Sequence, residues 1–314
     1  MENMFFLRDV IGNYMAELGK KNEKVVVVNA DLMRTSRNND FVNRFPERAF
    51  NVGIAEQNMV SFSAGLAHEG FIPYAFSMAP FISMRACEQC RTDVAYSNLK
   101  VRLIATYSGE SGGISGATHW GIEDCGIMRA IPNMVILEPS DPVQAKKMLD
   151  ESLNYDGPIY LRNSVEPVNS FYNNDYQFNI GKASMPKEGN AGAYICSGVM
   201  VSYALRAAFD IYKETGLDVR VVDMHTIKPI DRVAVIDASK TGNIVVAQDH
   251  NIIGGLGSAV QEVMAENGIS VNITILGIRD QFDTIAHAKY LYHKNKIDSD
   301  GLKETMMRMI KLKK

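Results

Sequence analysis

The sequence of 314 residues has little of what marks membrane, nucleic-acid-binding or disulfide-stabilised proteins. It contains four cysteines and one tryptophan, carries a formal net charge of -3, and has no uninterrupted apolar run of membrane-spanning length. Its basic residues are scattered, which gives no support to a nucleic-acid or membrane-surface role. The first residues, MENMFFLRDV, lack the basic segment, apolar segment and cleavage site of a secretory leader. These absences predict a cytoplasmic protein with neither nucleic acid nor membrane as a partner.

The cysteines give no sign of a metal site. Only Cys87 and Cys90 have the spacing of metal ligands, and CEQC without a second pair or a nearby histidine makes a poor zinc site. We interpret the two residues as small apolar side chains one helical turn apart. No metal ligand is therefore assigned to this chain.

Apolar strands alternate with helical segments in both halves of the chain, which is typical of doubly wound parallel sheets. Between the halves, the stretch 166–190 is rich in Asn, Pro, Gly and Ser and has no sustained period, which favours a linker. We predict an α/β protein of two doubly wound domains, 1–165 and 191–314. The predicted strands are 25–28, 101–107, 134–137, 193–196, 219–223, 244–247 and 271–276. The predicted helices are 7–19, 56–69, 81–97, 142–153, 200–216 and a segment from the glycine turn 254–257 to 267.

One carboxylate, Glu56, stands out in the segment NVGIAEQNMVSFSAG at 51–65. It lies between a glycine turn and a predicted helix of small residues. A carboxylate in an apolar neighbourhood is costly unless it has a charged partner or a chemical task. Taken alone, the position suits two roles equally, a helix N-terminal glutamate stabilised by the helix dipole or a buried catalytic acid.

Six ordered blocks carry a family pattern: ADL at 30–32, VGIAEQNM at 52–59, GATHWGIED at 116–124, IMRAIPNM at 127–134, VVDMHTIKPID at 221–231 and HNIIGGLGSAV at 250–260. Together they resemble the C-terminal half of transketolases, which are thiamine diphosphate enzymes. They are most similar to the smaller subunit of a split transketolase, in which two chains make one enzyme. The resemblance implies a pyrimidine-binding domain for thiamine diphosphate followed by a transketolase C-terminal domain. It also implies ketol transfer in pentose phosphate metabolism.

The resemblance implies which residues bind the cofactor. Glu56 matches the glutamate that hydrogen-bonds N1′ of the aminopyrimidine, which lets the cofactor act as its own base. Phe81 matches the aromatic residue that stacks on the pyrimidine ring, with Phe76 as a competitor and the register open by one residue. Leu32 matches the apolar support of the bent cofactor, and Asp31 and Ile54 match neighbouring contacts. For Asp31, a helix cap after the strand is an equal alternative.

The same resemblance implies residues for the sugar substrate. His119, approached by the glycine-rich stretch 109–116, matches a histidine that contacts the donor sugar and helps to move protons. Arg8, Thr35 and Arg162 match positions that bind sugar phosphates, although solvated or salt-bridged arginines are an alternative for each.

Two positions of the histidine loop depart from the family pattern. Ser115 replaces an Asp that reads a sugar hydroxyl, and Trp120 replaces a Gln. The usual ketose phosphate donor therefore does not follow from the resemblance.

The sequence contains no GDG motif, which in this family begins the magnesium site of the cofactor's diphosphate. The resemblance therefore implies an N-terminal transketolase subunit that carries GDG and supplies the Mg²⁺ ligands. It implies a heterotetramer of two large and two small chains, and no activity of this chain alone.

Three other interpretations remain beside this one. They are the beta subunit of a 2-oxo acid dehydrogenase E1 component, a fragment of a deoxyxylulose phosphate synthase, and a non-catalytic relative acting as a scaffold. The GGLG turn before Ser258 is interpreted as a tight connection between strand and helix, not as a phosphate site. His225, Lys228, Asp249 and His250 are expected to have structural or interface roles.

Overall fold

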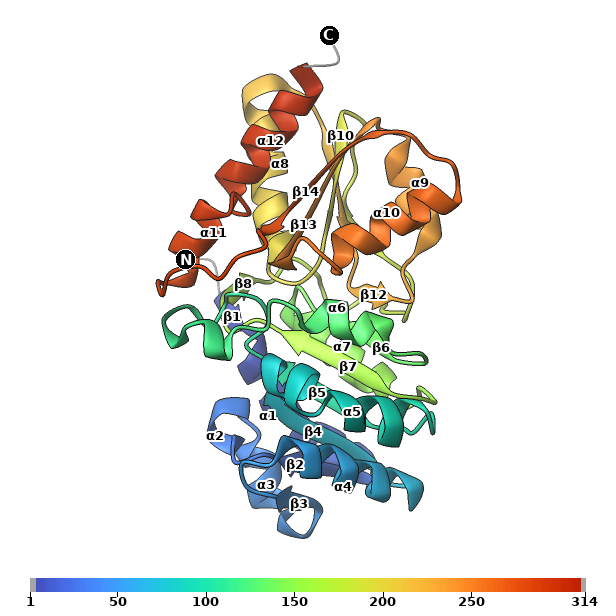
Figure 1. The fold of residues 1–314 in the computed structure, drawn as a ribbon. Helices are drawn as coiled ribbons and strands as arrows, with labels where there is room; N and C mark the ends of the chain where they lie inside the picture. The colour runs from blue at the N-terminus through green and yellow to red at the C-terminus, as the bar shows by residue number, and fades with distance from the viewer. Residues whose placement is uncertain (1–3, 312–314) are drawn as a thin grey trace.

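Two twisted sheets flanked by helices organise the computed structural model, which describes residues 4–311 (Figure 1). Over these residues the first sheet has the strand order β12-β6-β7-β5-β4-β2-β3, and the second has the order β14-β13-β10-β11-β9. The prediction of an α/β fold with helices around mainly parallel sheets is confirmed. Within the same range, no helix combines the length and apolar character needed to cross a membrane.

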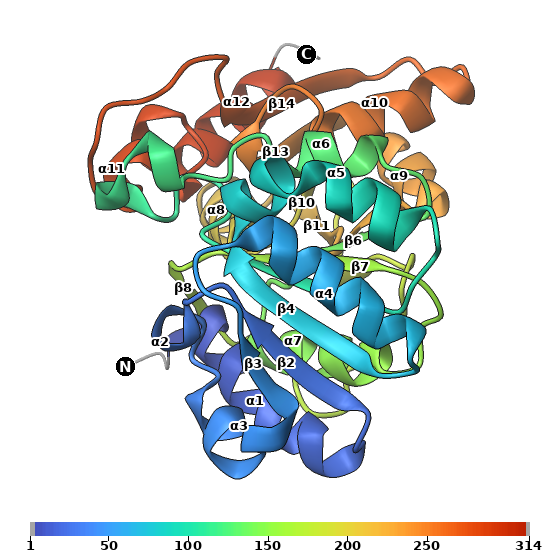
Figure 2. The same cartoon turned by 60° about the horizontal axis from the view of Figure 1, so that its bottom comes forward.

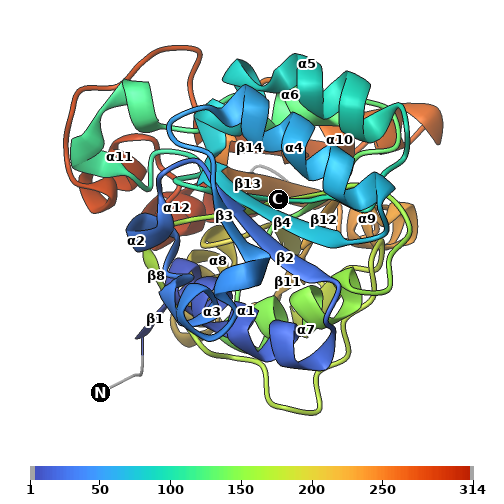
Figure 3. The same cartoon turned by 90° about the horizontal axis from the view of Figure 1, so that it is seen from below.

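The first sheet is buried on both faces, because its apolar strands lie between two helical layers. Seen from below, α4 and α5 lie on one side of this sheet and α1, α3 and α7 on the other (Figure 3). The parallel strands are β2 (Val25–Asn29), β3 (Ala49–Asn51), β4 (Ile72–Met78), β5 (Arg102–Thr106), β6 (Val135–Leu137) and β7 (Ile159–Asn163). The covering helices are α1 (Leu7–Lys21), α3 (Asn39–Arg44), α4 (Glu56–His68), α5 (Cys87–Gln89), α6 (Asp124–Ala130) and α7 (Pro142–Ser152).

The helix predicted at 81–97 is not a regular α-helix. Two π-helical segments, Phe81–Arg85 and Cys90–Ala95, flank the short α5. Wide turns of this kind occur mainly as single insertions and often near functional sites. Cys87 and Cys90 are free thiols here, and Cys90 is buried in the core.

The second sheet carries α8 and α12 on one side and α9 and α10 on the other (Figure 1). Its strands are β9 (Ser184–Lys187), β10 (Gly192–Cys196), β11 (Val219–Asp223), β13 (Asn243–Asn251) and β14 (Asn272–Ile278). The helices of this half are α8 (Met200–Thr215), α9 (Arg232–Ser239), α10 (Leu256–Glu266), α11 (Ala288–Lys294) and α12 (Ser299–Lys311). The strand β9 and the short β8 (Pro167–Asn169) lie in the stretch predicted as a linker, so part of that stretch is structured. β8 pairs with β1 (Met4–Phe6), and β9 pairs with β11.

A strand from the second half completes the first sheet. β12 (Thr226–Lys228) pairs antiparallel with β6, with Thr226 opposite Leu137. The Nζ of Lys228 donates to the carbonyl oxygens of Arg129 and Ile131 at 2.9 and 2.5 Å. The two halves therefore share a sheet as well as a connecting segment.

Candidate active site

Glu56 is a buried carboxylate at the first position of α4. Its side chain is 1% exposed, and the loop before it turns at Gly53, whose φ is +76°. Its Oε1 accepts a hydrogen bond from Ser77 Oγ at 3.2 Å, and its Oε2 accepts one from Arg85 Nη1 at 2.6 Å. A buried carboxylate is tolerated when a charge and hydrogen bonds compensate it, and the helix N-terminus adds a favourable dipole. The carboxylate is thus held in one place by α4, β4 and the π-helical segment.

An aromatic ring and a histidine face each other near this carboxylate. Phe81 is partly exposed, and its ring centroid lies 5.6 Å from that of His119 in an edge-to-face arrangement. The guanidinium carbon of Arg85 lies 4.4 Å from the Phe81 centroid. Phe76, the competing aromatic residue, is fully buried inside β4 and offers no open ring face. The structure therefore links Glu56 to Phe81 through Arg85, and Phe81 to His119 through their ring contact.

The segment after β2 reaches the same edge of the sheet. Asp31 is exposed with φ of +58°, its N–H donates to Asn51 Oδ1 at 3.0 Å, and Asn51 Nδ2 donates to its Oδ1 at 3.2 Å. It does not cap the following helix α2 (Met33–Ser36), whose N-cap residue is Leu32. Leu32 is partly buried, and Ile54, two residues before Glu56, is 77% exposed. These residues lie where parallel strands end, which is the usual ligand edge of such sheets.

The residues predicted to bind phosphate are dispersed. Arg8 and Thr35 are partly buried, on α1 and α2, and Arg8 Nε lies 3.4 Å from Asp9 Oδ1. Ser115 is exposed at the end of the 3-10 turn Gly113–Ser115. Arg162 has a different place, in the middle of the protein on β7.

Arg162 does not fit the expected phosphate contact. Its side chain is 0% exposed, its Nε and Nη2 each lie 3.0 Å from an oxygen of Asp124, and its Nη1 lies 2.6 Å from Glu138. Further donors go to the carbonyl oxygens of Gly121 and Asp249. The guanidinium group that would bind a phosphate is therefore already paired with buried carboxylates. We correct the expectation: Arg162 is an ion-pair residue of the core.

The loop that carries His119 is fastened to the C-terminal half. Gly109 has φ of +61°, and a Cβ there would lie 2.0 Å from Asp249 Cγ, so only glycine fits. The N–H of Glu110 donates to Asp249 Oδ1 at 2.9 Å. Trp120 is buried, donates from Nε1 to the carbonyl oxygen of Gly113 at 3.1 Å, and packs in a cluster with Ile278. Trp120, where the sequence departs from the family pattern, is therefore a buried residue that supports the loop from within.

The contact between this loop and the C-terminal half contains two buried acids, Glu110 and Asp249, whose pKa values are raised. Burial, reinforced by the charges of Asp249 and Asp283, raises the pKa of Glu110 to about 8. Burial likewise raises the pKa of Asp249 to about 7. The Oε2 of Glu110 accepts a hydrogen bond from Asn295 Nδ2 at 3.0 Å. Because Glu110 and Asp249 hold the His119 loop to the C-terminal half, we expect the stability of this contact to depend on pH.

Glu110→Gln is expected to make the chain more stable at alkaline pH. The folded pKa of Glu110 is above its unfolded value of 4.5, so its stabilising contribution is complete below pH 4.5 and is lost as pH rises through about 8. The amide avoids that loss, and we expect a gain of about 1 to 3 kcal/mol at pH 9 and almost none at pH 5. Thermal unfolding from pH 5 to 9 measures the difference, with the exposed Glu304→Gln as control. Equal curves for Glu110→Gln and the parent chain would contradict the prediction.

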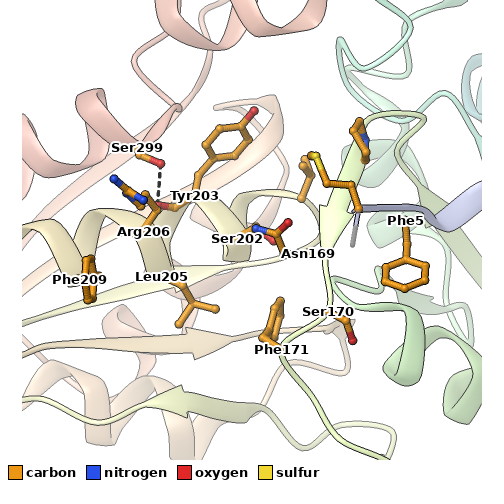
Figure 4. Close-up of a pocket in the computed structure, with 13 residues that line it drawn as sticks. Phe5, Asn169, Ser170, Phe171, Ser202, Tyr203, Leu205, Arg206, Phe209 and Ser299 are labelled. Atoms are coloured by element: carbon orange, nitrogen blue, oxygen red, sulfur yellow. Dashed lines mark hydrogen bonds between the residues drawn. The ribbon is translucent and has the colours of Figure 1, made fainter. Parts of the chain in front are cut away.

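A large hollow lies away from these residues. It has a volume of about 970 Å³ and lies between α8 and the β1–β8 pair, where Tyr203, Arg206, Phe209 and Phe171 line it (Figure 4). Glu56, Phe81 and His119 do not line it. Figure 2 shows α4 on the opposite flank of the first sheet from α7, with its N-terminal end near the carboxyl end of β4. Over residues 4–311, no group of three or more His, Cys, Asp or Glu side chains is arranged to hold a metal ion.

Comparison with known proteins decides the family. The model of the transketolase pyrimidine binding domain matches residues 4–169, and that of the transketolase C-terminal domain matches residues 181–301. The chain belongs to the transketolase family. The resemblance inferred from six sequence blocks is thereby confirmed. The transketolase family depends on thiamine diphosphate, and this chain holds the pyrimidine-binding and C-terminal domains.

Relatives of similar length show that this part of a transketolase also exists as a separate chain. A putative transketolase C-terminal section of Methanocaldococcus jannaschii is 41% identical over 307 residues, which are 97% of this chain and 96% of the relative. A 6-deoxy-6-sulfo-D-fructose transketolase subunit of a Clostridium species is 38% identical over 92% of this chain and 89% of its own length. A solved split gene transketolase, described as an inactive β4 tetramer, matches with a TM-score of 0.90 and 35% identity over 99% of this chain and 100% of that one. This transketolase chain is therefore a small subunit of the split kind.

Sequence reasoning missed two members of the site. Ser77 and Arg85 contact Glu56 directly, yet neither was singled out. Arg85 follows Phe81 by four residues, and an arginine at this spacing from the aromatic residue was the available signal. No signal in the sequence marks Ser77, because a serine in a buried strand has no distinctive pattern.

Proposed function

We propose that this chain is the small subunit of a thiamine diphosphate-dependent transketolase. The enzyme would move a two-carbon ketol unit from a ketose phosphate to an aldose or aldose phosphate. One observation supports this above the others: Arg85 links the buried carboxylate of Glu56 to the partly exposed ring of Phe81, and that ring contacts His119. A non-catalytic scaffold would have no use for a buried acid at the ligand edge of the sheet.

The residues present suit the pyrimidine half of the cofactor. Glu56 would hold N1′ of the aminopyrimidine through one carboxylate oxygen, and Phe81 would offer a ring face to it. Leu32, Ile54 and Asp31 lie at the same edge and would border the ring. When bound, thiamine diphosphate supplies a carbon nucleophile that makes and breaks carbon–carbon bonds beside a carbonyl group.

Proton control is the contribution of this chain's own residues. Glu56 is shielded from water, so its carboxylate would share a proton with the ring nitrogen of a bound cofactor and not with solvent. Its position is fixed by Ser77 at Oε1. His119 is partly exposed, with Nδ1 2.9 Å from Thr118 Oγ1, which leaves Nε2 to contact a sugar hydroxyl or carbonyl.

The proposed assembly contains two large and two small chains in the cytoplasm. The large chain would be an N-terminal transketolase subunit with a GDG motif, and its carboxylate and amide oxygens would hold Mg²⁺ and the diphosphate. The absence of GDG from these 314 residues supports this division of the site. The relative described as an inactive β4 tetramer supports the expectation that small chains associate without being active.

An anionic ketose is the proposed donor class. Arg8 and Thr35 lie on α1 and α2 beside the strand ends, and Ser115 lies on the histidine loop. A relative named for a sulfo sugar supports an anionic group at one end of the substrate. With Arg162 committed to the core, Arg8 is the proposed anchor for that group.

The chain alone is expected to transfer no ketol unit, and activity is expected on mixing with a GDG-containing large subunit, thiamine diphosphate and Mg²⁺. Transfer between ketose and aldose phosphates is followed by separation of the sugars, with each subunit alone as a control. Activity of the purified small chain by itself would overturn the proposed division of the site. Cofactor binding by the mixture without transfer from any ketose would overturn the reaction.

A further inference from the structure

The guanidinium of Arg85 occupies both features of the site that suit an aminopyrimidine. It donates from Nη1 to Oε2 of Glu56 at 2.6 Å, and its central carbon lies 4.4 Å from the ring centroid of Phe81. A guanidinium is planar, delocalised and rich in N–H donors, so it stacks on aromatic faces and binds carboxylates. A carboxylate contact and a ring contact are also the two interactions proposed here for the cofactor's pyrimidine.

The backbone presents Phe81 and Arg85 on one side. Both belong to the π-helical segment Phe81–Arg85, where the N–H of Ala86 bonds to the carbonyl oxygen of Phe81 at 3.2 Å. Residues four apart on a helix lie on the same face, so the arginine folds back over the ring. The segment thus supplies both the aromatic ring of Phe81 and the guanidinium group of Arg85 that lies over it.

Burial differs sharply between the two members of the ion pair. The Glu56 side chain is 1% exposed, whereas the Arg85 side chain is 46% exposed. The arginine therefore closes the carboxylate from the open side of the site and has solvent into which it can withdraw. Glu56, in contrast, is fixed from within by Ser77.

We propose that Arg85 is a placeholder for the aminopyrimidine: it covers Phe81 and pairs with Glu56 until the ring arrives, and then gives up Oε2. This inference rests on the proposed function and adds to it a positioning residue that keeps the buried carboxylate paired and oriented beforehand. The arrangement costs affinity, because binding must displace the arginine. If the arginine-closed form is present about nine-tenths of the time, the apparent affinity is about tenfold weaker than that of the open site.

The test compares cofactor binding to variants of the assembled two-subunit complex. Arg85→Met keeps an unbranched side chain but cannot pair with Glu56, and we expect it to bind thiamine diphosphate with Mg²⁺ about tenfold more tightly in calorimetric titration. Arg85→Lys keeps the charge without the planar face and is expected to fall between the two. Arg206→Met is the matched control, since Arg206 also pairs with a carboxylate, Asp210, and lies over a phenylalanine, Phe209, but far along the chain on α8.

A second measurement detects the space that the Arg85 guanidinium leaves when the side chain is removed. In Arg85→Ala, added guanidinium chloride at low millimolar concentration should weaken thiamine diphosphate binding competitively, whereas sodium chloride at equal ionic strength should not. The parent complex should show no such difference between the two salts. Circular dichroism and thermal unfolding confirm that each variant is folded, and Arg85→Lys carries the test if the other variants are not.

The outcomes separate this inference from the proposed function. Tighter binding by Arg85→Met, with Arg206→Met unchanged, supports the placeholder. Equal or weaker binding by Arg85→Met overturns it, because the arginine then has no competing role or itself holds the cofactor. Failure of every form, including the parent complex, to bind thiamine diphosphate overturns the proposed function and the placeholder with it.

Discussion

Glu56→Gln is expected to lower the kcat of the assembled transketolase by roughly 100-fold to 10,000-fold, the usual contribution of a positioned acid or base. The amide has nearly the same shape and can still form a hydrogen bond, but it cannot exchange a proton with a ring nitrogen. The chemical step therefore suffers, while binding of the cofactor's diphosphate by the large subunit does not. The measurement is turnover with saturating substrates and cofactor, together with calorimetric titration of thiamine diphosphate.

A second glutamate, at the C-terminal end of α4, supplies the control for this experiment. Glu69 is exposed just beyond the end of the same helix, so Glu69→Gln should retain the parent turnover. The Glu56 variant must also be shown to be folded, because its amide leaves Arg85 without an anionic partner. If the kcat of Glu56→Gln stayed within about twofold of the parent value, the decrease would be far smaller than expected, and Glu56 would not have the proposed catalytic role.

Arg162→Met is expected to destabilise the isolated chain by about 3 to 5 kcal/mol, because it leaves buried carboxylates without their cation. Both Asp124 and Glu138 are almost completely buried, and Arg162 is the cation that pairs with each of them. Methionine has a similar length and no charge, so the packing volume is largely kept. The free energy of unfolding in urea measures the loss.

A double variant and a surface control sharpen this second prediction. Arg162→Met combined with Asp124→Asn should recover part of the lost stability, because one of the unpaired charges is removed. Arg232→Met breaks an exposed pair with Glu266 and should change the free energy of unfolding by less than about 1 kcal/mol. If Arg162→Met were equally mild, the buried network would not stabilise the fold as described.

The regular parts of the fold were predictable from local pattern. The run of four valines in β2 and the apolar periodicity of α1 need no distant contact to be recognised, and both elements were found within two residues of their bounds. β4 and β7 were not predicted, because Pro73 interrupts the first and Arg162 lies in the second. In β7, the buried carboxylates around Arg162 make this charged residue compatible with a central strand.

The candidate site was predictable only in part, for a similar reason. The position of Glu56 follows from its block of sequence, and the burial of its carboxylate agrees with that placement. The contact with Arg85 depends on a π-helical turn, which no residue pattern announced. Likewise, the support of the His119 loop by Asp249 and Trp120 depends on contacts between residues more than one hundred positions apart.

The crossing of β12 into the first sheet limits how the molecule can move. A strand that hydrogen-bonds to β6 while its chain continues into α9 ties both halves into one mechanical unit. If one half rotated against the other to open the ligand edge, the hydrogen bonds between β12 and β6 would break. Entry and exit of substrates must therefore rely on side chains, loops or the neighbouring subunit, and cutting the gene between its two sequence domains would leave the first without its outermost strand.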